Sequence, residues 1–442
     1  MALQRTAPET SGESVPIDRI VESGLCIGCG LCQSIAGPDR LRVEMTAQGR
    51  LRPAVLRELD SATLARIGAV CPGLRIAGAE IERLPADIDH DPIWGPATSM
   101  VVAHAGDPEI RFRAAAGGVL SALSDLLLRS GQVEFVLHVA ASRQQPMRSE
   151  RQVSFDRAQV LEGAGSRYGP VAPLIDFLQV LDRGQPFAFV GKPCDISAIR
   201  NLAKHDARVD RWMKYALTLI CGGESELGKS QDVLDGFGLS EDALRLFRYR
   251  GYGNPGPTRV ETRDGRAFDL SYRDMWADES GWRIQSRCKI CPDAIGEAAD
   301  LVVGDCWPGC DPVGEDEGFN SIMVRTRAGS ELYGAAIAAG AVIVDRPLGF
   351  RDFDYFQPHQ VRLKKALWAR LAAMRVAGLA APAVARLRVK KIARGNTVAE
   401  NLAEGRGTLQ RIKAGRVGEC AVNSAGPAKP RGDAIEGQHQ RG

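Results

Sequence analysis

The sequence predicts a mixed α/β (α+β) protein, with a small N-terminal unit followed by a larger domain built on a mixed sheet. Two observations lead to this fold class. Three closely spaced cysteines lie near the start of the chain, beside short strand and helix signals. From residue 100 onward, short runs rich in apolar and β-branched residues alternate with helical patterns, as in a parallel or mixed sheet covered by helices. The 442 residues are enough for two or three domains.

The composition is that of an ordinary globular protein, with 44% hydrophobic and 25% charged residues. No apolar stretch is long enough for a membrane span, so none is predicted. The first 16 residues are polar and include acids, unlike a secretion signal. Without such a signal, eleven clustered cysteines favour metal ligands over disulfides, and we expect a cytoplasmic protein.

Composition also divides the chain into segments. The leader is rich in Ser, Thr, Glu and Pro, and the end of the chain is rich in Gly, Lys and Arg, so both are expected to be disordered. The predicted segments are a disordered leader (1–19), a cysteine-rich unit (20–80), a linker (81–97), the two halves of the larger domain (98–245 and 246–376) and a basic disordered tail (395–442).

Positive charge gathers at the C-terminal end. Residues 361–442 contain 17 Lys and Arg against 5 Asp and Glu. Such an end could dock an acidic protein, such as a small ferredoxin, or touch nucleic acid. We favour a solvated helix followed by a tail, because charge runs are usually solvated surfaces. No recognition motif for nucleic acid is present, so no nucleic-acid partner is predicted.

The strand and helix signals follow one another in order. The cysteine-rich unit shows a strand over 41–45 and a helix over 61–69. Gly117 and Gly118 open a helix, because apolar residues recur at helical spacing after them. An Asp-Gly pair predicts a hairpin over 260–268. The other predicted strands cover 100–104, 135–139, 187–190, 215–220, 299–303, 321–325 and 341–344, and the other helices cover 172–181, 196–202, 331–339 and 361–376.

Cys26, Cys29 and Cys32 are separated by two residues each, with glycines between them. This spacing is typical of ferredoxins, in which thiolates bind a 4Fe-4S cluster, and glycine lets the loop bend around the cluster. The local run contains no fourth cysteine, and the best candidate is Cys71, which precedes a proline. A zinc site usually shows two CxxC pairs or histidine ligands. We therefore favour a ferredoxin-like 4Fe-4S unit over zinc.

A second metal site is predicted from cysteines of three separate segments. Cys288 and Cys291 form a CxxC pair, whereas Cys194 and Cys221 each follow a predicted strand. Loops at the carboxyl ends of strands meet at one edge of an α/β sheet, so the four could converge there. The alternatives are a redox-active dithiol at the CxxC pair and plain buried cysteines elsewhere. Two further cysteines, at positions 306 and 310, receive no role.

Phosphate-binding signals are weak. Gly117 and Gly118 at a helix start could cradle an anion, with a simple tight turn as the alternative. Lys192 and Arg113 could pair with phosphates, with an exposed salt bridge as the alternative. Neither a GxGxxG fingerprint after the first strand of the larger domain nor a P-loop is present.

As a set, several short motifs resemble those of the beta subunits of coenzyme F420 hydrogenases and dehydrogenases. That family includes single-chain relatives, the ferredoxin-dependent 8-vinyl reductases and the 7-hydroxymethyl chlorophyll reductases. The resemblance covers about residues 20 to 375. It rests on CIGCGLC with Cys71-Pro72, Ala116-Gly117-Gly118, Gly165-Ser166-Arg167-Tyr168, Gly191-Lys192-Pro193-Cys194-Asp195-Ile196, Cys221-Gly222-Gly223, Arg287-Cys288-Lys289-Ile290-Cys291, Ala299-Asp300, Gly304-Asp305 and Arg325-Thr326.

The resemblance implies FAD and one or two 4Fe-4S clusters as cofactors. It makes Cys194, Cys221, Cys288 and Cys291 the ligands of a second cluster. It also makes Gly117, Gly118, Ser166, Tyr168 and Lys192 neighbours of the flavin. One motif departs from the family: many members have Gly-Thr-Pro-Cys where this chain has Gly191-Lys192-Pro193-Cys194. A lysine there changes the charge near the flavin or the substrate, so the substrate is not fixed by the resemblance.

The function implied is that of an iron–sulfur flavoprotein oxidoreductase. It would pass electrons from a ferredoxin or another donor protein through two 4Fe-4S clusters to FAD, and on to a small organic acceptor. Lys192, Tyr168 and Asp305 are candidate proton donors, each with a structural role as the alternative. The oligomeric state is open, and an oligomer is one option.

Two other functions stay open. One is a coenzyme F420-reducing or F420-oxidising beta subunit, which would need a hydrogenase or dehydrogenase partner. The presence of both cluster motifs in one chain favours a self-contained reductase over it. The other is a non-catalytic iron–sulfur electron carrier or sensor, which would bind clusters but no flavin.

Overall fold

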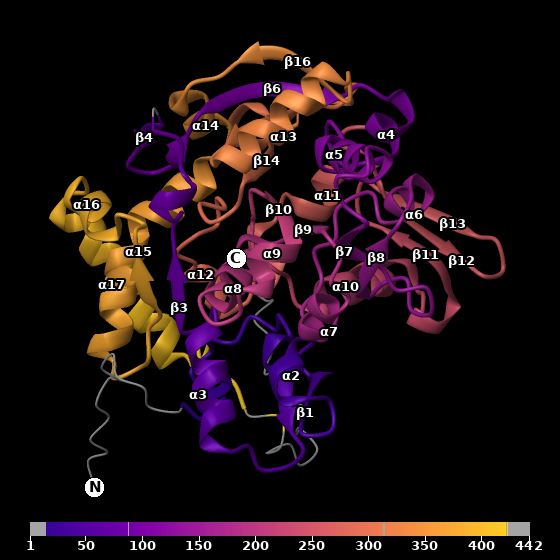
Figure 1. Cartoon of the computed structure of the whole chain (residues 1–442). Helices are drawn as coiled ribbons and strands as arrows, with labels where there is room; N and C mark the ends of the chain where they lie inside the picture. Colours follow the sequence, from indigo (N-terminus) through magenta and orange to yellow (C-terminus); the bar gives the residue numbers. More distant parts are fainter. Residues whose placement is uncertain (1–14, 87, 313, 421, 423–442) are drawn as a thin grey trace, which may run out of the picture.

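The computed structural model describes residues 15–86, 88–312, 314–420 and 422. Its centre is an eight-stranded mixed sheet, which confirms the predicted α/β class (Figure 1). The strands lie side by side in the order β16-β6-β15-β14-β10-β9-β7-β8. Their bounds are β6 Ser99–Ala105, β7 Phe135–Ala141, β8 Ser149–Ser154, β9 Phe187–Gly191, β10 Met213–Leu219, β14 Leu301–Asp305, β15 Asn320–Val324 and β16 Val342–Pro347. Both predicted halves of the larger domain contribute strands, so they form one sheet.

Five strands of this sheet run in the same direction. β7, β9, β10 and β14 pair in parallel, and β6 has the same direction because β15 runs antiparallel to both β14 and β6. Their carboxyl ends therefore lie at one edge. Ala105, Gly191, Leu219 and Asp305 end four of these strands there. This edge is where ligands bind in open α/β sheets.

Helices cover both faces of the sheet. One face packs against α5 (Val119–Arg129) and α13 (Arg327–Ala338), and the other packs against α7 (Phe177–Asp182) and α8 (Pro193–Ala203). Strand residues alternate between the two cores. In β14, for example, Leu301 and Val303 join the α5 and α13 side, whereas Val302 joins the α7 and α8 side. This two-residue period is what a sheet buried on both faces requires.

The small N-terminal unit lies beside this domain, at the bottom of Figure 1. Strand β1 and helix α3 confirm the elements predicted over 41–45 and 61–69. Residues 1–14 of the predicted leader lie outside the described residues, and its last three residues belong to helix α1. The elements of the unit are α1 Ile17–Glu22, α2 Leu31–Ala36, β1 Leu41–Met45, β2 Leu51–Val55, α3 Ser61–Val70 and β3 Arg75–Ala77.

A three-stranded sheet and several short helices flank the centre. The predicted hairpin forms, because β12 pairs antiparallel with β13 around the Asp-Gly turn. None of the helices within the described parts of the chain is long and apolar enough to cross a membrane. The flanking elements are β11 Leu244–Arg248, β12 Thr258–Thr262, β13 Ala267–Leu270, α4 Pro108–Arg113, α6 Arg157–Glu162, α9 Arg208–Trp212, α10 Leu227–Phe237, α11 Tyr272–Trp276 and α12 Ser286–Lys289.

Three expectations differ from the structure. The helix predicted over 172–181 begins only at Phe177, because the backbone N–H of Leu174 donates to the carbonyl of Cys29 at 2.9 Å. The linker predicted over 81–97 includes a hairpin and the buried Trp94, whose indole N–H donates to Asp354 at 2.8 Å. This segment therefore packs against the domain. Its elements are η1 Ile81–Arg83, β4 Asp89–Asp91 and β5 Gly95–Ala97.

The third difference is in the predicted tail over 395–442. Residues 398–413 form helix α17, which begins with a capping box between Thr397 and Glu400 and packs against helix α15. Residue 421 and residues 423–442 lie outside the described residues. The C-terminal elements, which group at the left of Figure 1, are α14 Phe350–Phe356, α15 Pro358–Val376, β17 Ala383–Ala385, α16 Val389–Arg394 and α17 Val398–Lys413. Strand β17 pairs in parallel with β3 and so joins the C-terminal elements to the N-terminal unit.

Candidate functional site

The first group of cysteines, the outer quartet, is Cys26, Cys29, Cys32 and Cys71. Three lie in the loop and first turn around the start of α2, and Cys71 ends α3. Gly30 within the loop has a φ of 88°, and a Cβ there would lie 2.5 Å from the side chain of Ile175. Only glycine therefore allows the loop to approach the domain this closely.

Burial raises the pKa of all four thiols of the outer quartet, that of Cys71 to about 11. Neighbouring thiolates add to this effect, since Cys29 is influenced by Cys32 and Cys71, and Cys32 by Cys26 and Cys71. The four sulfur atoms thus lie close enough to influence one another, with Cys29 buried and the other three half-buried. Buried thiols stay protonated unless a metal takes the place of the proton.

The second group, the inner quartet, is Cys194, Cys221, Cys288 and Cys291. Cys194 lies in the first turn of α8, Cys221 follows β10, and the other two lie in and after α12. All four line one cavity together with Lys192 and Glu224. Burial raises the pKa of each thiol, that of Cys291 to about 11. The structure thus brings together the four cysteines of the second predicted site.

Backbone N–H groups point at sulfur in both quartets. The N–H of Gly28 lies 3.4 Å from Sγ of Cys26, and the N–H of Gly223 lies 3.4 Å from Sγ of Cys221. The N–H of Glu224 lies 3.4 Å from Sγ of Cys288. Such donors stabilise negative charge on sulfur. Within the described residues, no three Cys, His, Asp or Glu side chains gather as the ligands of one metal ion would.

Lys192 lies at the inner quartet. Its ammonium group is 2.5 Å from Glu224 and 3.6 Å from Asp195. Glu224 also accepts a hydrogen bond from Gln285, whose side-chain carbonyl accepts one from Arg52 at 2.7 Å. A buried polar chain therefore runs from the inner quartet to Arg52, whose charge lowers the pKa of Cys26 against the larger effect of burial.

Tyr168 and Asp305 meet through a residue that the sequence did not single out, Arg250. The guanidinium of Arg250 is 97% buried and donates to Asp305 at 2.9 and 3.2 Å and to the hydroxyl of Tyr168 at 3.3 Å. It also lies over the ring of Trp307, 4.6 Å from its centroid. Tyr168 in turn packs against Trp276, with ring centroids 4.4 Å apart. We call these five residues the arginine–aromatic cluster.

Three buried donors of this cluster have no hydrogen-bond partner: Nε of Arg250, Nε1 of Trp276 and Nε1 of Trp307. The predicted residue Ser166 lies in the adjacent segment, where a Cβ at Gly165 would lie 3.0 Å from the carbonyl of Arg250. A ligand with flat rings and hydrogen-bond acceptors would suit these donors and aromatic faces.

Gly117 and Gly118 lie at the same edge of the sheet, where the carbonyl of Gly117 accepts from the N–H of Ala105. Gly118, with a φ of 73°, caps helix α5. The side chain of Asn320 already accepts from the N–H of Val119 at 3.2 Å, so one donor of the predicted anion cradle is occupied. Arg113 is a half-buried residue of α4 that pairs with Glu109 at 3.2 Å.

Two glutamines near the start of α15 connect the inner quartet to the arginine–aromatic cluster. Gln357 donates to the carbonyl of Asp305 at 2.7 Å, and Gln360 donates to the carbonyl of Cys221 at 3.2 Å. Strands β14 and β10, which carry these two carbonyls at or just beyond their ends, are neighbours in the sheet. The cysteine site and the cluster are therefore adjacent along one edge.

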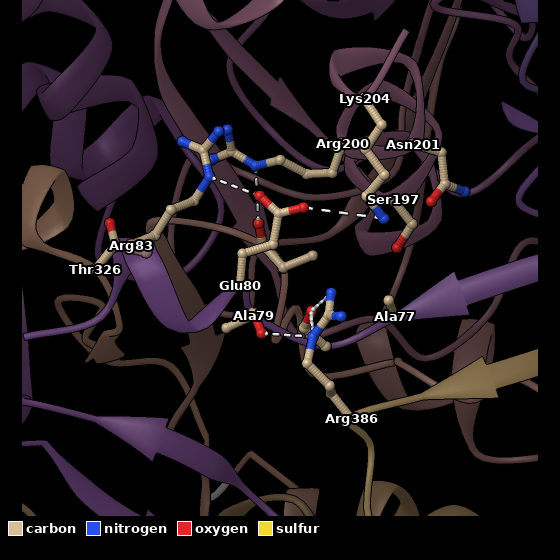
Figure 2. A pocket seen from close by; sticks show the side chains of 12 residues that line it. Ala77, Ala79, Glu80, Arg83, Ser197, Arg200, Asn201, Lys204, Thr326 and Arg386 are labelled. Carbon is tan, nitrogen blue, oxygen red and sulfur yellow. Dashed lines mark hydrogen bonds and ion pairs between the residues drawn. The ribbon is translucent and has the colours of Figure 1, made fainter.

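A separate small pocket lies between the N-terminal unit and α8 (Figure 2). Its walls carry Arg83, Arg200, Lys204 and Arg386, and Glu80 pairs with Arg83 at 3.1 Å. None of the predicted site residues lines it. The basic side chains are largely occupied by carboxylates and backbone carbonyls, as with Arg200, which donates to Asp300 at 3.1 Å.

Two family models match this chain. Residues 100–179 match the N-terminal part, and residues 184–347 the C-terminal part, of the coenzyme F420 hydrogenase/dehydrogenase beta subunit. The matched region contains the inner quartet and the arginine–aromatic cluster. The outer quartet and the C-terminal helices α15–α17 lie outside it.

Relatives with known names are distant. The coenzyme F420-dependent sulfite reductase of Methanocaldococcus jannaschii is 24% identical over 335 residues, which are 72% of this chain and 47% of that protein. The chain thus spans about half the length of that relative. The coenzyme F420 hydrogenase subunit beta of Methanosarcina barkeri is 23% identical over 57% of this chain and 82% of that subunit.

A third relative, the F420-dependent formate dehydrogenase 1 subunit beta of Methanococcus maripaludis, is 25% identical over 56% of this chain and 62% of that subunit. Among solved structures, a chain of the F420-reducing [NiFe] hydrogenase complex of Methanosarcina barkeri matches with a TM-score of 0.46 and 21% identity. That match covers 63% of this chain and 95% of the other.

Proposed function

The chain belongs to the coenzyme F420 hydrogenase/dehydrogenase beta-subunit family of oxidoreductase subunits, and on this premise we propose that it is an iron–sulfur flavoprotein oxidoreductase. It would pass electrons from a ferredoxin or another donor protein to a small organic acceptor, in the cytoplasm, with two 4Fe-4S clusters and FAD as cofactors. The observation that carries this proposal is the pair of cysteine quartets, one of which lies beside the arginine–aromatic cluster at the ligand-binding edge of the sheet.

The residues fit these groups. Four neighbouring thiols with backbone N–H donors directed at sulfur are a suitable ligand set for a 4Fe-4S cluster, so Cys26, Cys29, Cys32 and Cys71 would hold one and the inner quartet the other. The unpartnered donors of the arginine–aromatic cluster suit the acceptor-rich ring system of a flavin. When bound, these cofactors supply one-electron transfer and its exchange for two-electron chemistry.

The protein's own residues would orient the reacting groups, neutralise charge and supply protons. Lys192 places a positive charge beside the inner quartet, balanced by Glu224 and Asp195. Arg250 fixes the hydroxyl of Tyr168 and the carboxylate of Asp305 in one place. Of the three candidate proton donors, these two are therefore held together, whereas Lys192 serves the cysteine site. Tyr168 is our choice for the proton donor, because its phenolic O–H is a hydrogen-bond donor that Arg250 holds in place.

A second candidate function is that of a coenzyme F420-reducing or F420-oxidising subunit of a larger complex. The names of the relatives favour it, since they include F420 hydrogenase and F420-dependent formate dehydrogenase subunits. The two functions differ in the electron partner. Reduction of the purified protein by reduced ferredoxin and by reduced F420, followed at the flavin absorption, would distinguish them.

Anaerobic purification with iron, sulfide and flavin counted per chain tests the proposal. Two 4Fe-4S sites and one flavin predict about eight irons, about eight sulfides and about one FAD. Iron without flavin would favour a non-catalytic electron carrier or sensor. Zinc without iron would contradict both this proposal and the F420-linked alternative.

A further inference from the structure

Arg287 lies between the two cysteine quartets. It directly precedes Cys288 of the inner quartet, and its side chain is 98% buried. One guanidinium nitrogen donates to the carbonyl of Pro72, the residue after Cys71 of the outer quartet, at 3.1 Å. Another donates to the carbonyl of Ile290, the residue before Cys291, at 3.2 Å. A single side chain thus bridges the backbone of both sites.

This buried cation has no carboxylate partner among the described residues. Arg52, Arg200 and Arg250 are equally buried, but each pairs with a carboxylate, at 2.6, 3.1 and 2.9 Å. The two bonds of Arg287 both go to neutral carbonyls, and its Nε has no hydrogen-bond partner. Arg325 is also fully buried and donates only to carbonyls. Because a buried charge without a counter-charge costs several kcal/mol, an anionic group beside Arg287 would be strongly stabilising.

The groups that would supply negative charge near Arg287 are the cysteine sulfurs of both quartets, because the carbonyls that its guanidinium contacts belong to the residue after Cys71 and the residue before Cys291. A 4Fe-4S cluster bound by four thiolates is anionic, and it gains a further negative charge when it is reduced. A cluster at either site would therefore supply the missing counter-charge.

We propose that Arg287 is a positioning residue shared by both cluster sites, which holds the two cysteine loops against each other and serves as their common counter-ion. The proposal rests on the proposed function, because it requires a cluster at each quartet. A fixed positive charge near two anionic clusters favours the reduced form of both. Arg287 then raises the reduction potentials of both clusters together.

The test compares three variants of the full chain, purified anaerobically and titrated with dithionite while each cluster is followed by electron paramagnetic resonance. Arg287→Gln removes the charge, and Arg287→Lys keeps it but cannot donate to both carbonyls at once. Lys289→Gln is the matched control, because it removes a positive charge from an exposed position of the same helix, α12. Iron per chain is measured for every sample.

For Arg287→Gln we expect the equilibrium constant for reduction of each cluster to fall about tenfold, which is 59 mV for a one-electron step. In Arg287→Lys and Lys289→Gln the equilibrium constant for reduction should stay within about threefold of that of the unmodified chain. Arg287→Lys keeps the positive charge, and the charge that Lys289→Gln removes is screened by solvent.

The outcomes separate the two proposals. An unmodified chain without iron contradicts the proposed function itself. Two clusters in Arg287→Gln at unchanged potentials, or a shift confined to one cluster, would overturn the shared role of Arg287. If Arg287→Gln loses iron, the Arg287→Lys variant decides between the outcomes. Full iron and nearly unchanged reduction potentials in Arg287→Lys would support the role of Arg287 as counter-ion. A tenfold fall in the equilibrium constant for reduction, despite the retained charge, would overturn that role.

Discussion

The guanidinium of Arg52 in strand β2 lies 2.6 Å from the carboxylate of Glu419, 367 positions later in the chain. Arg52 is fully buried, and Glu419 also pairs with Arg50 at 2.8 Å. These ion pairs attach the end of the described chain to the N-terminal unit, which also contains Cys26. Because this C-terminal segment lies outside the matched family region, its contacts are a feature of this chain beyond that region.

Substituting Glu419 by Gln should destabilise the protein. The change leaves Arg52 buried without its counter-ion, which costs about 3 kcal/mol in the free energy of unfolding. Glu317→Gln is the matched control, since its pair with Arg111 is exposed and should contribute less than about 0.5 kcal/mol. Chemical denaturation of both variants measures the difference. Equal free energies of unfolding in the Glu419→Gln and Glu317→Gln variants would show that the Arg52–Glu419 pair does not stabilise the attachment of the N-terminal unit.

Single cysteine variants should remove one cluster each. Cys71→Ser takes a ligand from the outer quartet and Cys291→Ser takes one from the inner quartet, so each should lose about half of the iron, given four irons at each site. Cys420→Ser, at an exposed position, is the control and should keep all of it. Iron analysis and paramagnetic resonance check this. Loss of all iron in either variant would contradict two independent sites.

Arg250→Gln should release the flavin while iron stays bound. The change removes the cation that holds Tyr168 and Asp305 together and that lies over Trp307. We expect bound flavin to fall at least tenfold. Arg248→Gln is the control, because that arginine stands two residues away in the same segment and lies over Tyr252 instead. The measurement is the ratio of flavin, released by heating, to iron in each variant. Equal retention of flavin in both variants would show that Arg250 does not help to bind it.

Stability should fall in mild acid because of His138. Burial lowers the pKa of this histidine to about 4, and its ring lies 2.7 Å from the hydroxyl of Ser154. In the unfolded chain its pKa is about 6.5, so below that value the unfolded state binds the proton more readily. The stabilising contribution is complete above pH 6.5 and is lost as the pH falls toward 4.

Between pH 7 and pH 5 this single group should lower the free energy of unfolding by about 2 kcal/mol. Denaturation of the His138→Gln variant at both pH values should show a correspondingly smaller difference. His205→Gln, which changes an exposed histidine, should keep the full difference. An unchanged pH dependence in His138→Gln would assign the effect to other groups.

The sequence predicts part of the site, because the patterns that indicate it involve residues that are near one another in the chain. The spacing of Cys26, Cys29 and Cys32 depends on one loop, and the strands that precede Cys194 and Cys221 have their own apolar pattern. The rule that strand ends meet at one edge then predicts where the inner quartet gathers. Helix α17 could also be predicted from the sequence, because Thr397 and Glu400 form a capping box. The charged composition of this segment led to the prediction of disorder instead.

The sequence by itself determined the fold class, the order of most strands and helices, the family and the cysteine-rich character of two sites. Only the tertiary structure decided that Arg250 joins Tyr168 to Asp305, that Lys192 faces the cysteines, and that Arg287 bridges both quartets. The physical reason is the range of the interactions. Periodicity and turn chemistry act between near neighbours in the chain, whereas the partner of a buried charge is determined by packing between segments that are tens to hundreds of residues apart.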